Sequence, residues 1–360
     1  MKILYAIQGT GNGHLSRARD IIPLLQQKSD LDILISGSQA DVELPYKIKY
    51  RFTGLSFVFG KKGGVDLLAT YRKSKLKRLY TEIKNLPVEK YNLVINDFEP
   101  VSAWACLVRK KECISLSHQA AVLNRKSPVP KSVDVVGKAI LKNYAPCTHK
   151  YGFHFKAYDK NIFTPVIRSE VRQLKTSDNG YYTVYLPSYD DERIMNVLGE
   201  ATDVEWQIFS KHSKKSFTKN NFFIRPISNE AFIKSVAKCS GILCGAGFET
   251  PAEALFLKKK LMVIPMKNQY EQVCNAAALE EMGVDVIKSL KKKYISQINE
   301  WINGSKVIPI NYPEQTEDIL NMIVKAHCVS PAVIPKTGAD ITSLKILKNI
   351  IKESIFKTAG

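Results

Sequence analysis

Short apolar runs alternate along the chain with segments whose apolar residues recur at helical spacing. Residues 2–7 and 31–36 are rich in β-favouring side chains. Between them, 14–27 places apolar residues at helical intervals (Leu15, Ala18, Ile21, Ile22, Leu24 and Leu25). A strand–helix–strand order predicts a parallel sheet. Further strands are predicted at 91–96 and 113–116, with helices at 101–109 and 133–144.

A second series of the same kind begins near residue 181. It predicts strands at 181–186, 205–209, 221–225, 241–244 and 261–264, with helices at 191–198 and 229–238. We therefore expect an α/β protein with two Rossmann-like parallel-sheet domains that face each other across a cleft. The predicted domains are 1–164 and 165–330. Residues 331–360 are predicted to form an amphipathic helix that docks on a domain or lies on an anionic membrane surface.

Composition places the chain among globular proteins with anionic partners. The 360 residues carry a net charge of +19, in basic clusters that are scattered along the sequence. Such a charge suits nucleotides or acidic lipid surfaces, and no zinc finger or RNA-binding signature favours nucleic acid. The seven cysteines form no CxxC pair, and no apolar run reaches 18 residues. We expect a cytoplasmic protein with reduced thiols and no spanning helix, with peripheral contact at the inner membrane face left open.

A glycine-rich loop, QGTGNG at 8–13, follows the first strand. Its spacing differs from GxGxxG, so a nicotinamide site is not favoured. The next strands end in Asp97, Glu99 and His118, and the carboxyl ends of parallel strands share the edge where such sheets bind ligands. Glu99 and His118 are acceptor-side candidates, and Glu99 is also a candidate base. The alternatives are that Asp97 caps the following helix and that His118 is a hydrogen-bonded structural residue.

The stretch from Cys244 to Ala276 predicts a nucleotide-sugar site. Gly245 and Gly247 form a turn before a predicted helix, and the N–H groups and dipole at a helix start favour a diphosphate. Glu253 on that helix is placed to accept hydrogen bonds from a ribose. After the strand at 261–264, a polar loop ends in Glu271-Gln272, an acid–amide pair suited to sugar hydroxyls, and a further helix is predicted from Asn275.

Two motifs in these stretches resemble those of GT-B fold glycosyltransferases of the family 28 and family 1 type. These families include the transferase that adds N-acetylglucosamine to the lipid-linked peptidoglycan precursor. Their donor signature is matched by Gly245, Gly247, Thr250 and Glu253, and then by Glu271-Gln272 before Asn275-Ala276. The resemblance implies that Gly247 to Thr250 bind the diphosphate, Glu253 the ribose, and Glu271 with Gln272 the sugar. We assign these residues, together with Phe248, Gly11 and Gly13, to nucleotide-sugar binding.

The second motif is GTGNGH, Gly9 to His14. In family 28 relatives such a loop faces the acceptor, and in some family 1 members the corresponding histidine is a general base held by an aspartate. The resemblance implies that His14 is the base and Asp97 its partner.

This sequence departs from the relatives at Gly245, where they often have His or Arg. A positive contact for the phosphates must then come from elsewhere, and Arg225 is a candidate. Lys258 to Lys260 also replace the usual Gly-x-Pro.

We therefore predict an inverting glycosyltransferase that moves a hexosyl or N-acetylhexosaminyl group from a nucleotide sugar, most simply UDP-linked, to an acceptor hydroxyl. The predicted partners are the donor and an acceptor that is lipid-linked or soluble. No cofactor and no metal are expected, because this fold usually needs none. The alternatives are a nucleotide-sugar epimerase or hydrolase of the same fold, and a non-catalytic protein that binds an anionic ligand.

Overall fold

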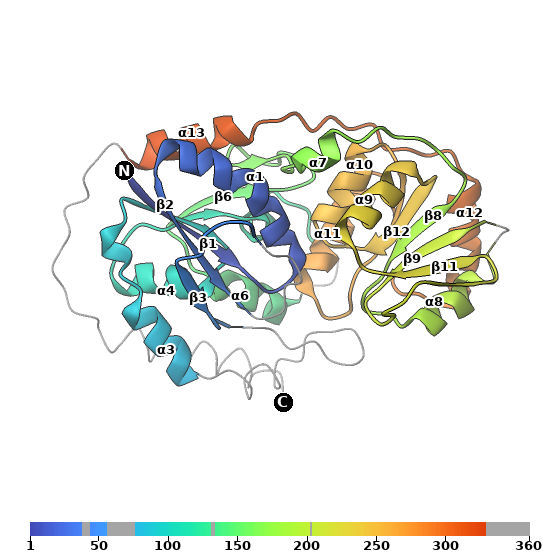
Figure 1. The fold of residues 1–360 in the computed structure, drawn as a ribbon, viewed down its shortest axis with the longest axis horizontal. Coiled ribbons are helices and arrows are strands. Elements are labelled where there is room, and N and C mark those ends of the chain that lie inside the picture. Colours follow the sequence, from blue (N-terminus) through green and yellow to red (C-terminus); the bar gives the residue numbers. More distant parts are fainter. Residues whose placement is uncertain (38–43, 56–75, 131–133, 202–203, 329–360) are drawn as a thin grey trace.

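The computed structural model describes residues 1–37, 44–55, 76–130, 134–201 and 204–328. The predicted helix at 331–360 lies outside the described residues. Two parallel-dominated sheets stand side by side in the molecule, each covered by helices (Figure 1). Within the described residues, no helix combines the length and apolar character that crossing a membrane would require.

The first sheet has the order β3-β2-β1-β4-β5-β6-β7, and all its pairs are parallel. Its strands β1 to β4 are Lys2–Gln8, Asp30–Ser36, Tyr50–Phe52 and Leu93–Asp97, and β5 to β7 are Ile114–Leu116, His149–Phe153 and Ile162–Phe163. Its helices are α1 (Asn12–Lys28), α3 (Leu76–Asn85), α4 (Pro100–Val108), α5 (His118–Val122) and α6 (Val135–Tyr144), with a 3-10 turn at Val88–Lys90. The predicted strands 2–7 and 31–36 and the helix between them are thus present, each within about two residues.

A short helix, α7 (Ser169–Arg172), leads into the second sheet, whose order is β10-β11-β9-β8-β12-β13-β14. Its strands β8 to β11 are Tyr182–Tyr185, Trp206–Ser210, Phe217–Lys219 and Phe222–Pro226, and β12 to β14 are Gly241–Gly245, Lys260–Ile264 and Asp285–Val286. Its helices are α8 (Asp191–Leu198), α9 (Asn229–Lys238), α10 (Glu249–Phe256), α11 (Tyr270–Glu281) and α12 (Ile295–Asn303), with a 3-10 turn at Lys292–Tyr294. Only β10 runs antiparallel among the described pairs of this sheet.

The chain returns to the first sheet at its end. Helix α13 (Thr316–His327) packs against α1, and Lys28 forms an ion pair with Glu317 across the two helices. Figure 1 shows α13 beside α1, far from the second sheet. The range 165–330 predicted for the second domain therefore ends in a helix that packs on the first domain.

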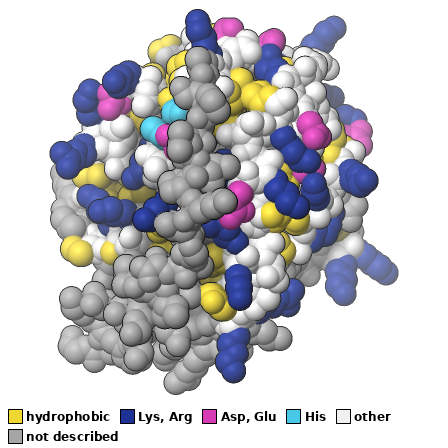
Figure 2. Space-filling view, turned by 90° about the vertical axis from the view of Figure 1, so that its left-hand side faces the viewer, with side chains coloured by type: hydrophobic (Ala, Val, Ile, Leu, Met, Phe, Trp, Pro, Cys, Tyr) yellow, Lys and Arg dark blue, Asp and Glu magenta, His cyan; other side chains and the backbone are white. Residues whose placement is uncertain are grey.

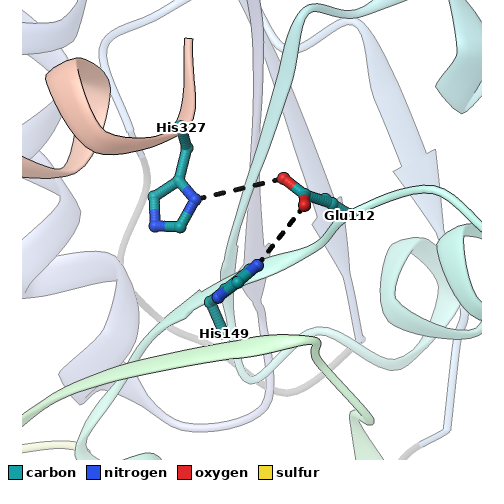
Figure 3. A group of neighbouring side chains, drawn as sticks. All are labelled: Glu112, His149 and His327. Carbon is teal, nitrogen blue, oxygen red and sulfur yellow. Dashed lines mark ion pairs between the residues drawn. The ribbon is translucent and has the colours of Figure 1, made fainter. Parts of the chain in front are cut away.

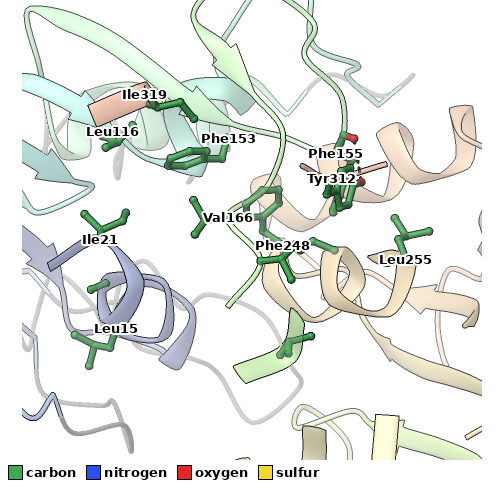
Figure 4. Packing of buried hydrophobic residues seen from close by; sticks show 14 of the residues in the cluster. Leu15, Ile21, Leu116, Phe153, Phe155, Val166, Phe248, Leu255, Tyr312 and Ile319 are labelled. Atoms are coloured by element: carbon green, nitrogen blue, oxygen red, sulfur yellow. Dashed lines mark hydrogen bonds between the residues drawn. The ribbon is translucent and has the colours of Figure 1, made fainter. Parts of the chain in front are cut away.

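One apolar cluster extends through both domains. It joins Leu15 and Ile21 of α1, through Val166 of the connector, to Phe248 and Leu255 beside the second sheet (Figure 4). The hydroxyl of Tyr312, in the returning segment, donates to the carbonyl oxygen of Phe155 at 3.0 Å. Burial of apolar area across the boundary holds the carboxyl edges of the two sheets against each other.

Candidate active site

The loop after β1 sets where α1 begins. Gly11 has φ of 91°, a backbone conformation that glycine adopts without strain, and α1 begins at the next residue. The helix thus starts two residues before the predicted position, and His14 lies in its first turn. Gly13 allows close approach, because a Cβ there would collide with the carboxylate of Glu249 from α10.

His14 and Asp97 meet as the sequence analysis proposed. Nδ1 of His14 lies 2.8 Å from Oδ1 of Asp97, at the end of β4. A contact this short with a carboxylate oxygen requires the proton on Nδ1, because two lone pairs would repel each other. The Nε2 atom then carries the lone pair, and the His14 side chain is 13% exposed while that of Asp97 is fully buried. This orientation leaves Nε2 available to accept a proton.

Arg17, which the sequence analysis missed, connects this pair to the second domain. Its Nη2 donates to both carboxylate oxygens of Asp97 at 2.8 Å, and its Nη1 forms an ion pair with Glu249. The Arg17 side chain is only 1% exposed. One sequence feature could have identified Arg17: it lies one helical turn after His14, on the buried face of α1. A buried arginine needs a carboxylate partner.

The charges of this cluster displace the pKa values of its members. Burial by itself lowers the pKa of His14, but the charge and hydrogen bond of Asp97 raise it above its usual value. Burial by itself raises the pKa of Asp97, but Arg17 and His14 bring it below its usual value. Asp97 thus stays ionised, and the pKa of His14 lies above its ordinary value of about 6.5.

Glu99 lies just after β4, as predicted, but its carboxylate is engaged in capping a helix. It is the N-cap of α4, where its carboxylate oxygens accept from the backbone N–H groups of Val101 (2.7 Å) and Ser102 (2.6 Å). The cap of this helix is therefore Glu99, and Asp97 is free to pair with His14. Burial raises the pKa of Glu99 against the opposing effect of these hydrogen bonds.

His118 lies at the boundary between the domains. Its Nδ1 donates to the carbonyl oxygen of Phe153 at 2.8 Å, and its Nε2 is 2.7 Å from Oδ1 of Asn275 in α11. Its ring also stacks on Phe248, with centroids 3.9 Å apart. Both ring nitrogens thus have protein partners, as the structural alternative for His118 supposed.

Gln119 joins the two halves of the site. Its Nε2 donates to Oε2 of Glu271 at 3.0 Å and lies 3.4 Å from Nε2 of His14. Glu271 is the second residue of α11, which begins at Tyr270, not at Asn275 as predicted. Glu271 and Gln272 therefore stand in the first turn of a helix, and the structure brings Glu271 close to His14.

The donor-side turn stands between β12 and α10. A Cβ on Gly247 would meet nothing within 4 Å, and one on Gly245 would meet only ordinary contacts. Thr250 is in the first turn of α10, and no side chain among the described residues caps that helix start. Oε1 of Gln272 accepts from the backbone N–H of Met266 at 2.9 Å, which fixes the neighbouring loop. The first turn of α10 thus leaves its backbone N–H groups without a side-chain cap and carries Glu249, whose carboxylate pairs with Arg17.

Glu253 is buried against Arg168 of the connector. The two carboxylate oxygens of Glu253 accept from Nε (2.5 Å) and Nη2 (2.9 Å) of Arg168. Burial raises the pKa of Glu253, although the Arg168 charge opposes this. A carboxylate offers about four acceptor sites, so this pair leaves capacity for further hydrogen bonds. Arg168 is a second residue that the sequence analysis missed.

Arg225 lies at the end of β11. Its guanidinium stands over the rings of Phe223 and Phe209, at 4.5 Å and 5.5 Å from their centroids. These rings hold the cation beside the carboxyl edge of the second sheet.

Comparison with known proteins gives a consistent result. The family model described as glycosyl transferase family 1 matches residues 1–303. No curated protein matches in sequence. The structure of UGT89C1 from Arabidopsis thaliana, complexed with UDP, is 11% identical, covers 98% of this chain and 99% of its own, and gives a TM-score of 0.56.

Two further solved structures are similar. UGT2 of Phytolacca americana, complexed with UDP-2fluoro-glucose and pterostilbene, is 12% identical with a TM-score of 0.56, over 98% of each chain. SnogD of Streptomyces nogalater is 11% identical with a TM-score of 0.50, over 90% of this chain and 99% of its own. At these identities the likeness concerns the fold.

Proposed function

We propose that this chain, which belongs to glycosyl transferase family 1, transfers a hexosyl or N-acetylhexosaminyl group from a UDP-sugar to an acceptor hydroxyl. The transfer is proposed to invert the anomeric configuration. The GT-B fold predicted from the sequence is confirmed by the similar structures, and the protein is a glycosyltransferase. Support for a UDP-linked donor comes from the solved neighbours that were crystallised with UDP or a UDP-sugar.

The observation that carries the proposal is the 2.8 Å contact between His14 and Asp97, at the edge where both sheets end. In the proposed mechanism, Nε2 of His14 takes the proton of the acceptor hydroxyl as its oxygen attacks the anomeric carbon. Asp97 holds the tautomer and stabilises the imidazolium that forms. A base whose pKa lies near the working pH combines availability with driving force, and such catalysis contributes about 10²–10⁴-fold.

The donor would bind on the second domain. The backbone N–H groups at the start of α10, from Gly247 to Thr250, would hold the diphosphate and stabilise the charge of the leaving group. Arg225 is proposed to supply the positive contact that Gly245 lacks, and Glu253 to accept from the ribose. Glu271, held by Gln119 near His14, would face the sugar. In this proposal no metal takes part in the transfer step.

The acceptor is proposed to enter a cavity of about 180 Å³ whose lining includes two neighbours of His14. Phe98 and Gln119, which line it, also neighbour His14, with Phe98 stacked on the imidazole at 6.3 Å between centroids. Lys142 and Lys150 line the cavity as well. We therefore propose an acceptor that carries an anionic group, which a phosphate-linked lipid would supply.

Calorimetry with UDP, GDP, dTDP and their sugars tests donor binding. We expect UDP to bind, and His14→Gln and Asp97→Asn to bind it as the wild type does. Failure of all three nucleotides to bind would contradict the proposal.

With a UDP-sugar and phosphorylated acceptors, both variants should lose about 10²-fold or more in turnover. NMR of the product should show an inverted anomeric configuration, whereas release of free or epimerised sugar from the donor alone would indicate the hydrolase or epimerase alternative.

A further inference from the structure

Three ligand-type side chains converge on the first domain, away from the site described above. They are Glu112, in the segment before β5, His149, which begins β6, and His327, which ends α13 (Figure 3). Their ligand atoms all lie within 4.8 Å of one another, and they are the one such group among the described residues. These residues lie far apart in the sequence and come together only because α13 returns to the first sheet.

Two separations in this group, one to each oxygen of Glu112, are near those of ligands around a shared ion. Nε2 of His149 lies 3.5 Å from Oε1 of Glu112, and Nδ1 of His327 lies 4.0 Å from Oε2. Both distances exceed the range of about 2.7–3.2 Å for a direct N–H···O bond. With Zn–N and Zn–O bonds of about 2.0–2.2 Å, tetrahedral geometry places ligand atoms about 3.3–3.6 Å apart. Small side-chain movements would therefore satisfy a zinc ion.

The surroundings of His327 suit its role as a ligand. Its Nε2 is 3.0 Å from the hydroxyl of Tyr151, so an Nε2–H can donate to this oxygen and leave the Nδ1 lone pair directed at Glu112. Metal-bound histidines are commonly oriented in this way by a hydrogen bond from the other ring nitrogen. The ring centroids of His149 and His327 are 4.4 Å apart, so the two imidazoles stand side by side.

The backbone that carries two of the ligands is well fixed. β5 pairs with β6 so that Ile114 is opposite His149, and the backbone N–H of His149 donates to the carbonyl oxygen of Cys113 at 3.2 Å. The side chain of His327 is 9% exposed, whereas those of His149 and Glu112 are 41% and 60% exposed. The site is thus built on a buried anchor and is open to an ion from solvent on its outer side.

We propose that Glu112, His149 and His327 bind a zinc ion that links α13 to the first sheet. Imidazole nitrogen with one carboxylate oxygen is a ligand set that zinc accepts, and solvent would supply the fourth position. The role is structural, since the ion ties the returning end of the chain to the domain that holds His14. The sequence analysis expected no metal because this fold usually needs none, and these three ligands have no local spacing that would reveal them.

Lys111 and Lys150 are the sequence neighbours of Glu112 and His149, and the face drawn in Figure 2 bears many Lys and Arg side chains. General attraction for cations therefore cannot account for binding here, and coordination by nitrogen has to supply the affinity. Hard cations such as Mg²⁺, which prefer oxygen ligands, should bind poorly.

The test uses the full chain after treatment with a chelator and dialysis. Calorimetric titration with Zn²⁺, and with Co²⁺ read by its tetrahedral d–d absorption, should give one ion per chain, and Zn²⁺ should raise Tm. Glu112→Gln and His149→Gln should each weaken binding about tenfold or more. His212→Gln removes an exposed histidine of the other domain and is the matched control, expected to bind as the wild type does.

Because Glu112 is exposed, Glu112→Gln should leave the metal-free fold and its Tm unchanged, which separates loss of binding from loss of folding. Zinc affinity in Glu112→Gln and His149→Gln equal to that of the wild type would overturn the proposal. So would a wild-type chain that binds no Zn²⁺ or Co²⁺.

Discussion

Arg17 and Glu249 form an ion pair across the boundary between the two domains. The same guanidinium holds both oxygens of Asp97, so a single buried arginine connects the second domain to the residue that orients His14. Approach of the two sheets and orientation of the candidate base are therefore structurally linked.

Replacement of Arg17 by Met should destabilise the protein strongly. It leaves Asp97 buried with only His14 as a charged partner, and removal of one member of a buried pair costs about 3–5 kcal/mol. Lys28→Met, which removes a charge from the same helix, should cost less than about 1 kcal/mol because its pair with Glu317 is near the surface. Urea unfolding of both variants measures the difference. Equal losses in the free energy of unfolding would show that Arg17 stabilises the protein no more than Lys28 does.

Gly13→Ala tests the approach of Glu249 to α1. The added methyl would displace the carboxylate from Arg17, so we expect a loss of about 1–3 kcal/mol in the free energy of unfolding. In a Glu249→Ala background the same substitution should cost almost nothing, because the collision is gone. Gly247→Ala, which meets open space, is the control and should leave the unliganded protein as stable as the wild type. Additive losses for Gly13→Ala and Glu249→Ala would contradict this interpretation.

The raised pKa of His14 predicts a pH dependence of defined sign. A group whose pKa is higher in the folded than in the unfolded state stabilises the fold below the unfolded value, about 6.5, and this stabilisation is lost as pH rises through the folded value. The difference in free energy of unfolding between wild type and His14→Gln should therefore decrease as pH rises from the unfolded pKa through the folded pKa of His14. NMR titration of the His14 ring gives its pKa directly.

Asp97→Asn should lower the pKa of His14, because the carboxylate charge that raises it is removed. The acid limb of the kcat/KM profile should move to lower pH by the same amount as the NMR titration. An unchanged titration in Asp97→Asn would exclude Asp97 as the source of the shift.

Glu253 is predicted to discriminate between ribose and deoxyribose. Wild-type protein should bind UDP about tenfold or more tightly than 2′-deoxy-UDP, because hydrogen bonds to charged groups contribute about 1.5–3 kcal/mol. In Glu253→Gln this preference should shrink, whereas Glu230→Gln, on the exposed start of α9, should retain it. Calorimetry with both nucleotides provides the comparison, and a preference that survives in Glu253→Gln would assign the ribose to other residues.

The sequence determined the layer structure and the edge at which the site forms. Parallel strands covered by helices on both faces require continuous apolar runs, and such runs are legible without any tertiary information. The same order of elements placed His14 and Asp97 at one sheet edge. Missed elements such as β10 and β14 are short, with three and two residues, and carry too little pattern to be recognised.

Tertiary structure alone decided which polar groups meet. Asp97 and Glu99 both precede α4, and the sequence could not tell which one caps it. Phe98 adopts φ of 57°, which turns the chain so that Glu99 reaches the helix N–H groups and Asp97 faces His14. The pairs Arg17–Glu249 and Arg168–Glu253 depend on how two domains dock, a relation between distant residues that no local pattern encodes. For the same physical reason, the convergence of His327 with His149 appears only when α13 is placed on the first sheet.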